Sequence, residues 1–180
     1  IISNDPEYNL GMRERRTLQK FLKETTSKIK SEWNIIHIAP GDGVEIPLIV
    51  DSLGPRLIKH YALIDISPEL LREAASFGAK KYKDLDFSIH CLDITSDELS
   101  PITEKLEKQY ASKNLIFLVG NGAILSDTQV LDHIKNSMES KDKLLITLEF
   151  YSEEREDKIL EQYKLPSVLN LFASSLAIIG

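Results

Sequence analysis

Two glycines, two carboxylates and a short amide side chain occupy positions from which they could together hold a nucleotide-like ligand. Gly41 and Gly43 directly follow an apolar run, and glycine lets a backbone turn tightly and come close to a ligand. Asp65 and Asp93 end two later apolar runs, and the segment 120–122, Gly-Asn-Gly, follows another. Each feature alone could be an ordinary turn or helix cap, so the residues indicate a binding site only if they lie together in the fold.

The spacing of these residues resembles that of a nucleotide-binding βαβ unit. The loop Ala39-Pro40-Gly41-Asp42-Gly43 precedes a helix expected to start near Val44, whose free N–H groups could face a polar or anionic part of a ligand. Asp65 follows Gly43 at the roughly 20-residue spacing of such units, and its carboxylate could accept both ribose hydroxyls. Asp93 could accept a hydrogen bond from an exocyclic amine such as that of adenine. Asp93 could equally cap the turn that begins at Thr95.

The elements that must position these residues follow from the pattern of apolar runs and helix start signals. In Ser67-Pro68 and in Ser100-Pro101 we expect the serine to cap a helix whose first residue is the proline, and Asp127-Thr128 predicts the start of another helix. Alternating strands and helices favour an α/β fold, a doubly wound, Rossmann-like, mostly parallel sheet with helices on both faces. Ligands in that fold bind outside the carboxyl ends of the strands, so we expect all four features at one edge. The predicted strands are Ile35–Ile38, Tyr61–Ile64, Phe87–Cys91, Leu115–Val119 and Leu144–Phe150, and further helices are expected over Thr17–Ile29 and Glu153–Tyr163.

The composition narrows the class of partner. With 180 residues, 42% of them hydrophobic, the chain can bury a sizeable core. The net charge of −6 argues against nucleic acid as the main partner. No apolar run reaches membrane-spanning length, and the single cysteine, Cys91, excludes an intrachain disulfide, so a cytoplasmic protein is expected. Cys91 is predicted to be a small buried residue, and no spacing of histidines around it predicts a metal site.

The motifs resemble those of the class I S-adenosylmethionine (SAM) dependent methyltransferases. The segment "IIHIAPGDG" is similar to the first glycine-rich motif of that class, "YALIDIS" to its acidic second strand and "HCLDI" to its third-strand acid. Within the class the chain is most similar to the histidine-specific methyltransferases of the ergothioneine pathway. That similarity extends over nearly the whole chain, through "DPEYNLGMRERRTL", "DISPELLREAA", "NLIFLVGNGAI" and "LLITLEF".

The resemblance implies SAM as cofactor and a small-molecule acceptor, such as the amino group of histidine or of a related amino acid. It implies that Asp65 holds the ribose and Asp93 the adenine amine, that Gly120 and Asn121 lie below the sulfonium, and that Tyr8 and Asn121 face the substrate. It identifies no catalytic side chain, and methyl transfer needs no obligatory nucleophile. The full set of implied cofactor-binding residues is Ala39, Pro40, Gly41, Asp42, Gly43, Asp65, Ile66, Asp93, Ile94, Gly120 and Asn121.

Two positions depart from the family pattern in the first motif. The family usually has an acidic residue where His37 stands and a glycine where Ala39 stands. A histidine on an apolar strand is more often a core residue with a hydrogen-bond partner than a ligand, and we predict the former for His37. These departures keep open an alternative function, a degenerate methyltransferase-like domain that binds a ligand or partner without catalysis.

Two other enzyme classes share the predicted sheet. A nicotinamide-dependent oxidoreductase should have a third glycine three residues after Gly43, where Ile46 stands. An aminopropyl transferase should have further acidic residues in the loop after the fourth strand, and these are not evident. We expect an N-terminal helical segment over 1–32, the SAM-binding domain over 33–152 and the beginning of an acceptor region over 153–180. The last strands of the fold are expected to be truncated.

Overall fold

The computed structural model describes residues 10–26, 31–119 and 128–147. Residues 18–147 form one compact unit, and residues 1–17 and 148–180 are assigned to a second. Of the second unit, the structure describes only the first part of the helix α1 (Leu10–Thr26). The fold below is that of the unit 18–147.

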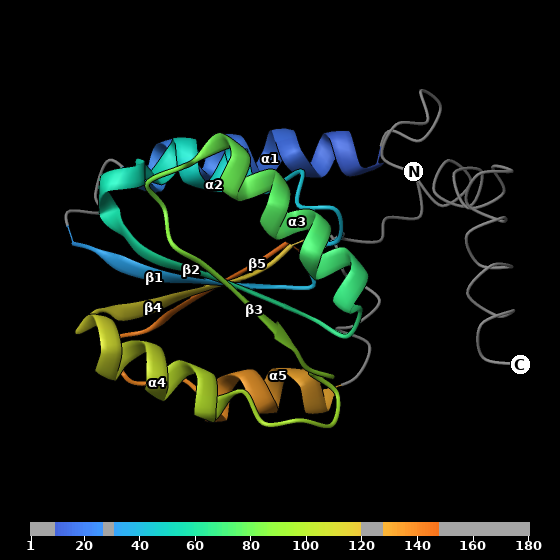
Figure 1. Cartoon of the computed structure of the whole chain (residues 1–180), viewed down its shortest axis with the longest axis vertical. Helices are drawn as coiled ribbons and strands as arrows, with labels where there is room; N and C mark the ends of the chain where they lie inside the picture. The colour runs from blue at the N-terminus through green and yellow to red at the C-terminus, as the bar shows by residue number, and fades with distance from the viewer. Residues whose placement is uncertain (1–9, 27–30, 120–127, 148–180) are drawn as a thin grey trace, which may run out of the picture. The chain divides into compact units, whose positions relative to one another are not determined.

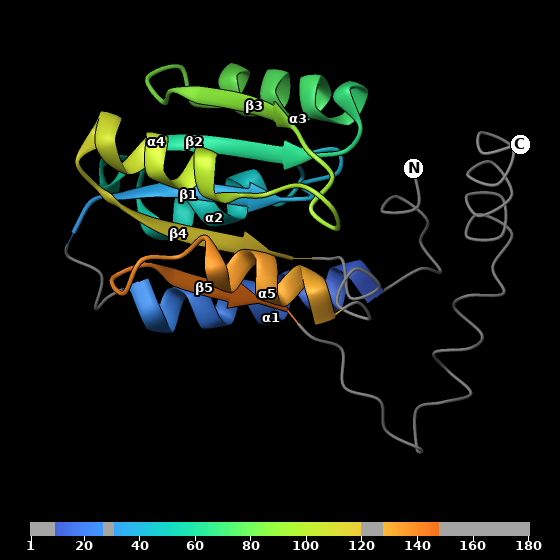
Figure 2. The same ribbon diagram turned by 90° about the horizontal axis from the view of Figure 1, so that it is seen from below.

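Five parallel strands form the central sheet. They are β1 (Trp33–Ile38), β2 (Ile58–Asp65), β3 (Phe87–Cys91), β4 (Lys113–Leu118) and β5 (Lys143–Ile146). Their spatial order is β3-β2-β1-β4-β5, and Figure 2 shows β1 at the centre with β3 and β5 at the two outer positions. All four pairings are parallel, so the carboxyl ends of the five strands lie at one edge. This edge is the one at which the sequence predicts a ligand site.

Helices cover both faces of the sheet, as the predicted doubly wound fold requires. Figure 1 shows α1, α2 and α3 on one face and α4 and α5 on the other. Two hydrophobic clusters fill the interfaces: Ile35, Leu63 and Phe117 turn toward the first group of helices, and Ile36, Ile64 and Ile116 turn toward the second. This alternation follows from the two-residue period of a strand. The remaining helices are α2 (Ile46–Leu53), the short 3-10 helix η2 (Pro55–Leu57), α3 (Pro68–Lys81), α4 (Ser100–Tyr110) and α5 (Thr128–Asn136).

The helix starts confirm one predicted cap and correct another. Ser67 caps α3, and its hydroxyl accepts a hydrogen bond of 3.3 Å from the Leu70 N–H. The prediction that Ser100 caps α4 is wrong, because Leu99 occupies the cap position without a side-chain bond and Ser100 is the first helical residue. Leu99 is completely buried in the core, and this burial fixes where the helix begins. Its apolar contacts therefore outweigh the local preference of serine for the cap.

Three other details differ from the sequence expectations. The helix predicted over Thr17–Ile29 begins earlier, at Leu10, and its apolar face contains the buried Leu18 and Leu22 but not Phe21, which is half exposed. Cys91 is exposed rather than buried, because it is the last residue of β3, the outer strand of the sheet. The strand predicted over Leu144–Phe150 runs from Lys143 to Ile146, and Thr147 is already outside it. Residues 148–150 and the helix predicted over Glu153–Tyr163 lie outside the described residues. No helix among the residues that the structure describes is long and apolar enough to cross a membrane.

Candidate functional site

The candidate site is the carboxyl edge of β1 and β2. The loop after β1 is tied to the end of β2 by a hydrogen bond of 2.7 Å from the Ala39 N–H to the Ile64 carbonyl oxygen. The end of β2 is tied in turn to β3, because the Leu92 N–H donates to the Asp65 carbonyl oxygen at 3.0 Å. The glycine loop, Asp65 and the segment leading to Asp93 therefore lie at one edge, as predicted.

The glycine loop adopts a left-handed backbone at three positions. The φ angles are +51° at Ala39, +56° at Gly41 and +80° at Gly43. A Cβ built on Gly43 would lie 2.9 Å from the Cα of Ala74 in α3, so this glycine permits close packing of the loop against a helix. A Cβ on Gly41 would meet no atom within 4 Å, so the backbone at Gly41 borders open space. Gly41 is thus the point of the loop to which a ligand could come close.

The start of α2 differs from the expectation of a helix beginning near Val44 with free N–H groups. The helix begins at Ile46, and Glu45 occupies its cap position without a side-chain bond. The Val44 N–H already donates to the Asp42 carboxylate at 3.3 Å, and the Ile46 N–H donates to the Gly43 carbonyl oxygen at 3.0 Å. Asp42 therefore stabilises the turn itself, and these two N–H groups are already satisfied.

Asp65 ends β2 with its side chain partly exposed. Its Oδ1 accepts a hydrogen bond of 2.9 Å from the Ser67 N–H, which fixes the orientation of the carboxylate ahead of α3. Among the described residues, no hydrogen bond to Oδ2 is found, so that oxygen is available to a donor from solvent or ligand. The next side chain, Ile66, is 65% exposed and places an apolar surface beside the carboxylate.

Asp93 lies two residues beyond the end of β3, in a turn that its own side chain closes. Its Oδ1 accepts bonds from the Thr95 N–H at 2.9 Å and the Thr95 hydroxyl at 2.7 Å, and these bonds lower the pKa of the Asp93 carboxyl below its usual value. The Asp97 carboxylate accepts a bond of 2.9 Å from the Asp93 N–H in return. The Asp93 side chain therefore caps the turn that begins at Thr95, as the alternative interpretation of the sequence expected.

Two further predicted cofactor residues are buried. Pro40 is enclosed within the glycine loop. Ile94 packs in the cluster between the sheet and α4 and α5, and its carbonyl oxygen lies 3.2 Å from the His133 Nδ1. The remaining predicted residues, Tyr8, Gly120 and Asn121, lie outside the described residues. β4 ends at Leu118, so the segment 120–122 follows a strand that ends at the same edge.

His37 is the buried core histidine that the sequence predicts. It is 1% exposed, its Nδ1 lies 3.0 Å from the Tyr61 hydroxyl, and burial lowers its pKa to about 3. Its ring is therefore neutral at pH 7. At the position where the family usually has an acidic residue, β1 of this chain supplies an uncharged imidazole.

Neither the hydrogen bond from Ala39 to β2 nor the left-handed backbone at Ala39 was predicted from the sequence. The available signal was the glycine that the resemblance places at this position, because glycine adopts positive φ at no steric cost. In this chain an alanine adopts the left-handed conformation that glycine favours, with a φ of +51°.

The geometry fits the adenosine part of SAM. The open side of Gly41, the outward carboxylate oxygen of Asp65 and the exposed Ile66 supply close backbone approach, an acceptor for hydroxyls and an apolar surface. No group of three or more histidine, cysteine, aspartate or glutamate side chains in the described part of the chain could hold a metal ion. Methyl transfer from a sulfonium does not need one, since the cofactor supplies the reactive group.

Comparisons with known proteins bear on the family of the chain. The sequence profile described as "Histidine-specific methyltransferase, SAM-dependent" matches residues 1–173. No curated protein sequence gives a significant match.

Similar solved structures share the fold at low identity. The N-methyltransferase NodS from Bradyrhizobium japonicum WM9 has 14% identity and a TM-score of 0.52, over 96% of this chain and 84% of that chain. A SAM-dependent methyltransferase from Aquifex aeolicus has 17% identity and a TM-score of 0.54, over 90% and 84%. The plantazolicin methyltransferase BpumL, in complex with a monoazolic desmethylPZN analog and SAH, has 16% identity and a TM-score of 0.57, over 93% and 58%. The match of the family profile to almost the whole sequence shows that the chain belongs to the histidine-specific, SAM-dependent methyltransferases.

Proposed function

We propose that this SAM-dependent methyltransferase transfers a methyl group to a nitrogen of a small amino-acid acceptor, histidine or a close relative. The family description supports this acceptor class. The observation that carries the cofactor half of the proposal is the convergence at one edge of an open-sided glycine, Gly41, and a fixed carboxylate, Asp65.

The residues of this edge would hold the cofactor by distinct contacts. Gly41 and Gly43 would border the methionine and ribose portions, and the Asp65 carboxylate would accept the ribose hydroxyls. Asp93 would accept a hydrogen bond from the adenine amine, with Ile66 against the apolar ring. Because Oδ1 of each aspartate is already bonded within its own turn, the second oxygen of each carboxylate would make the contact.

The acceptor would be held by residues outside the described part of the chain. Gly120 and Asn121 would lie below the sulfonium, and Tyr8 and Asn121 would face the acceptor. SAM supplies an electrophilic methyl group for in-line displacement. The protein then contributes alignment and the exclusion of water, and alignment alone accounts for about 7 kcal/mol or more in good intramolecular reactions. An acceptor amine that is already neutral needs no general base.

Isothermal titration with SAM tests the cofactor contacts. Asp65→Asn keeps an acceptor oxygen for the Ser67 N–H but removes the charge that would face the ribose, so it separates ligand binding from turn stability better than alanine does. Loss of a charge-assisted hydrogen bond of about 1.5–3 kcal/mol corresponds to weaker binding by roughly tenfold to a hundredfold. Asp84→Asn, an exposed aspartate between α3 and β3, is the matched control and should bind as the wild type does. Equal affinity for the Asp65→Asn variant would remove the ribose assignment.

A transfer assay tests the acceptor. The full chain would be incubated with SAM labelled in the methyl group and with histidine, histamine or other single amino acids. We expect label on histidine or a close relative and little on histamine, because an amino-acid site should read the carboxylate. Label on none of the amino acids, with SAM binding intact, would contradict the acceptor class but not the cofactor site.

A further inference from the structure

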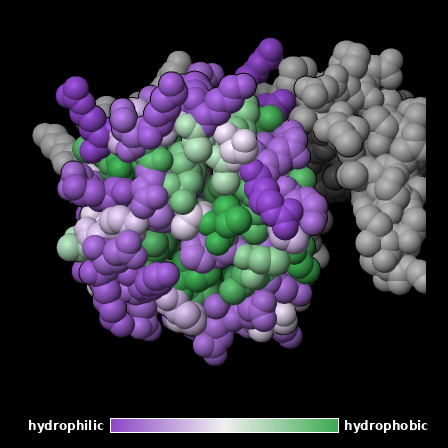
Figure 3. All heavy atoms as spheres, in the orientation of Figure 1, coloured by the Kyte–Doolittle hydropathy of each residue, from purple (hydrophilic) through white to green (hydrophobic). Residues whose placement is uncertain are grey.

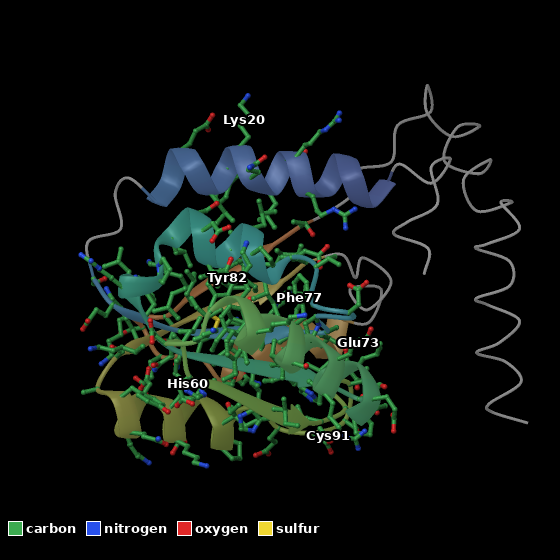
Figure 4. All side chains as sticks on the ribbon, turned by 45° about the horizontal axis from the view of Figure 1, so that its top comes forward. Lys20, His60, Glu73, Phe77, Tyr82 and Cys91 are labelled. Carbon is green, nitrogen blue, oxygen red and sulfur yellow. The ribbon has the colours of Figure 1, made fainter. Side chains whose placement is uncertain are left out.

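A chain of four polar side chains crosses from β3 to β2 on the face covered by α4. We call Asp86, His60, Ser88 and His90 the Ser88 relay. The Asp86 Oδ2 lies 3.0 Å from the His60 Nδ1, the His60 Nε2 lies 2.7 Å from the Ser88 Oγ, and the Ser88 Oγ lies 2.9 Å from the His90 Nε2. Figure 4 shows His60 beside α4, away from the end of β3 marked by Cys91.

The hydrogen-bond directions in the relay follow from the carboxylate at one end. Ionised Asp86 only accepts, so the His60 Nδ1 carries the proton and donates to it. The His60 Nε2 is then an acceptor, and the Ser88 hydroxyl donates to it. The His90 Nε2 must donate to the Ser88 Oγ, whose own proton is already used. The order Asp–His–Ser is that of a serine nucleophile with its general base and the group that orients the base.

Neighbouring groups hold His60 in this orientation. Its side chain is 4% exposed, and its ring stacks on that of Tyr110 from α4 at 4.7 Å between centroids and 19° between planes. The Tyr110 hydroxyl donates to the same Asp86 Oδ2 at 2.7 Å. Two contacts from one side chain therefore fix both the imidazole and the carboxylate behind it.

Both imidazoles of the relay are neutral near pH 7. Burial is the largest cause that lowers the pKa of His60 and of His90, and the positive charge of Lys105 in α4 lowers both further. Asp86 opposes this effect at His60. A neutral His60 can accept a proton, as a general base must.

The reacting pair of the relay, His60 and Ser88, lies back along the strands from the proposed cofactor edge, and only His90, which pairs with Ile64, lies near that edge. His60 precedes Asp65 by five residues on β2, which is about 16 Å along an extended strand. Ser88 is half-buried and pairs with Ala62 in the sheet, well before the carboxyl end. The cofactor proposal uses none of the four side chains.

The outer edge of the sheet supplies a hydrogen-bond donor next to Ser88. The Tyr61 N–H donates to the Asp86 carbonyl oxygen and the Leu92 N–H to the Asp65 carbonyl oxygen, so the even-numbered residues of β3 direct their backbone groups toward β2. A strand alternates these directions, and β3 is the outer strand, so the Ile89 N–H faces away from the sheet. Ile89 follows Ser88 directly and is 46% exposed.

We propose that Ser88 is a second reactive site of this protein, a nucleophile activated by His60 and Asp86 that takes an acyl or phosphonyl group from an activated ester or fluorophosphonate. In the acyl reaction the Ser88 Oγ bonds to the carbonyl carbon while its proton passes to the His60 Nε2. The bond from that carbon to the leaving oxygen then breaks, and the leaving group takes the proton from His60. The Ile89 N–H is the donor available to the oxyanion between the two steps.

Labelling of the full chain with an alkyl fluorophosphonate tests this site. In that reaction the Ser88 Oγ bonds to phosphorus, the P–F bond breaks, and fluoride leaves as the proton goes to His60. Intact mass and peptide mapping should show one adduct, on Ser88, that is absent from urea-unfolded protein and from Ser88→Ala. Asp86→Asn should slow labelling by at least tenfold, since a positioned general base contributes about 10²–10⁴ in rate. Asp86 is exposed, so this variant should fold even if a variant of buried His60 does not.

Matched controls separate reactivity from a purely structural network. Ser96→Ala removes an exposed serine that has no imidazole partner among the described residues, and it should label as the wild type does. No adduct on folded wild type, adducts spread over several serines, or an unchanged rate in Asp86→Asn would each overturn the proposal. SAM affinity should be unchanged in Ser88→Ala and Asp86→Asn, so this result is independent of the methyltransferase assignment.

Discussion

The Nδ1 of His37 lies 3.0 Å from the hydroxyl oxygen of Tyr61, and both side chains are completely buried between the sheet and its helices. The His37 ring also meets Tyr61 and Phe117 edge-on, with centroids 6.1 and 6.4 Å away. The position where related enzymes have an acid is thus part of the hydrophobic core in this protein. A cofactor amino group would have to be held by other residues.

This burial predicts a dependence of stability on pH. The pKa of His37 is about 3 in the folded chain and near 6.5 in the unfolded chain, so below pH 6.5 the unfolded state binds a proton that the folded state does not. The free energy of unfolding should therefore fall as the pH drops from about 6.5 toward 3, by about 1.4 kcal/mol per pH unit from this residue. Urea unfolding of the wild type and of His37→Gln at several pH values measures the effect.

The comparison with His37→Gln isolates this residue from the carboxylates and from the other histidines. Stability of the variant should fall less steeply with decreasing pH over the same window, because glutamine does not titrate. Parallel stability curves for the two proteins would mean that the pKa of His37 is the same in the folded and unfolded states, contrary to the burial argument.

The two loop glycines predict a matched pair of alanine variants. Gly43→Ala combines a positive φ with a contact of 2.9 Å to the Ala74 backbone, so we expect a loss of about 3 kcal/mol or more. Gly41→Ala adds a methyl group where no atom lies within 4 Å, so it should cost only the left-handed strain, about 1–2 kcal/mol. Thermal and urea unfolding would measure both, and equal losses would contradict the packing role of Gly43.

The Gly41→Ala variant should also bind SAM more weakly than the wild type under conditions in which both are folded, because its methyl group would occupy the proposed ligand space. Isothermal titration measures this difference in affinity.

Two non-glycine residues in the described part of the chain have left-handed backbone and predict stabilising variants. They are Ala39 and Ala111, both with a φ of +51°. Replacement by glycine removes a strain of about 1–2 kcal/mol and adds up to about 1 kcal/mol of chain entropy in the unfolded state. Ala111→Gly lies at the C-terminal cap of α4, a favourable place for glycine, and should gain about 0.5–1 kcal/mol. Ala39→Gly should gain a similar amount in urea unfolding, and a loss in both variants would rule out strain at these positions.

The contact between Gly78 and Phe87 predicts a coupled pair of substitutions. A Cβ on Gly78 of α3 would lie 2.7 Å from the Phe87 Cζ, and Phe87 packs on Tyr61 with centroids 5.3 Å apart. We expect Gly78→Ala alone to destabilise the fold by about 1–3 kcal/mol, despite the better helix propensity of alanine. With Phe87→Leu already present, the same change should cost much less. A double-mutant cycle by urea unfolding measures the coupling, and additive losses would show that the ring moves aside freely.

The sequence predicts the elements well where the hydrophobic pattern decides them. The alternation of apolar runs and capped helices predicts all five strands and the edge of the sheet at which Asp65 lies. It does not predict the true start of α4, because the place of Leu99 at the cap follows from its burial in the folded core and not from a local sequence signal. It also misplaces Cys91, since a strand pattern does not reveal which strand lies at the outside of the sheet.

The site residues also fall into two groups: those with a local sequence signal and those that only the folded sheet brings together. The glycine spacing and the strand-end acid predict that Gly41, Gly43 and Asp65 lie at one edge of the sheet, because both signals are local to one βαβ unit. The Ser88 relay joins residues from two strands with α4 packed over them, so only the assembled sheet brings His60 beside Ser88. The sole local hint was the spacing of Asp86, Ser88 and His90 at every second residue, which places them on one face of a strand.

The molecular surface around β3, the outer strand, exposes hydrophobic side chains. Figure 3 shows hydrophobic residues gathered at the middle of the face that looks onto β3 and α3, and Phe77 and Ile89 are among the exposed large hydrophobic side chains. Figure 4 places Phe77 on α3. Substituting Ile89 by lysine should leave the fold intact while adding a charge to the open strand edge, a common protection against edge pairing.

The close approach of Gly43 to Ala74 joins the loop after β1 to the helix that follows Asp65. The loop and the helix therefore hold each other in place without a bound cofactor. Under the proposed function, such preorganisation would keep the entropic cost of SAM binding small. A glycine required for close packing would then also be required for cofactor affinity.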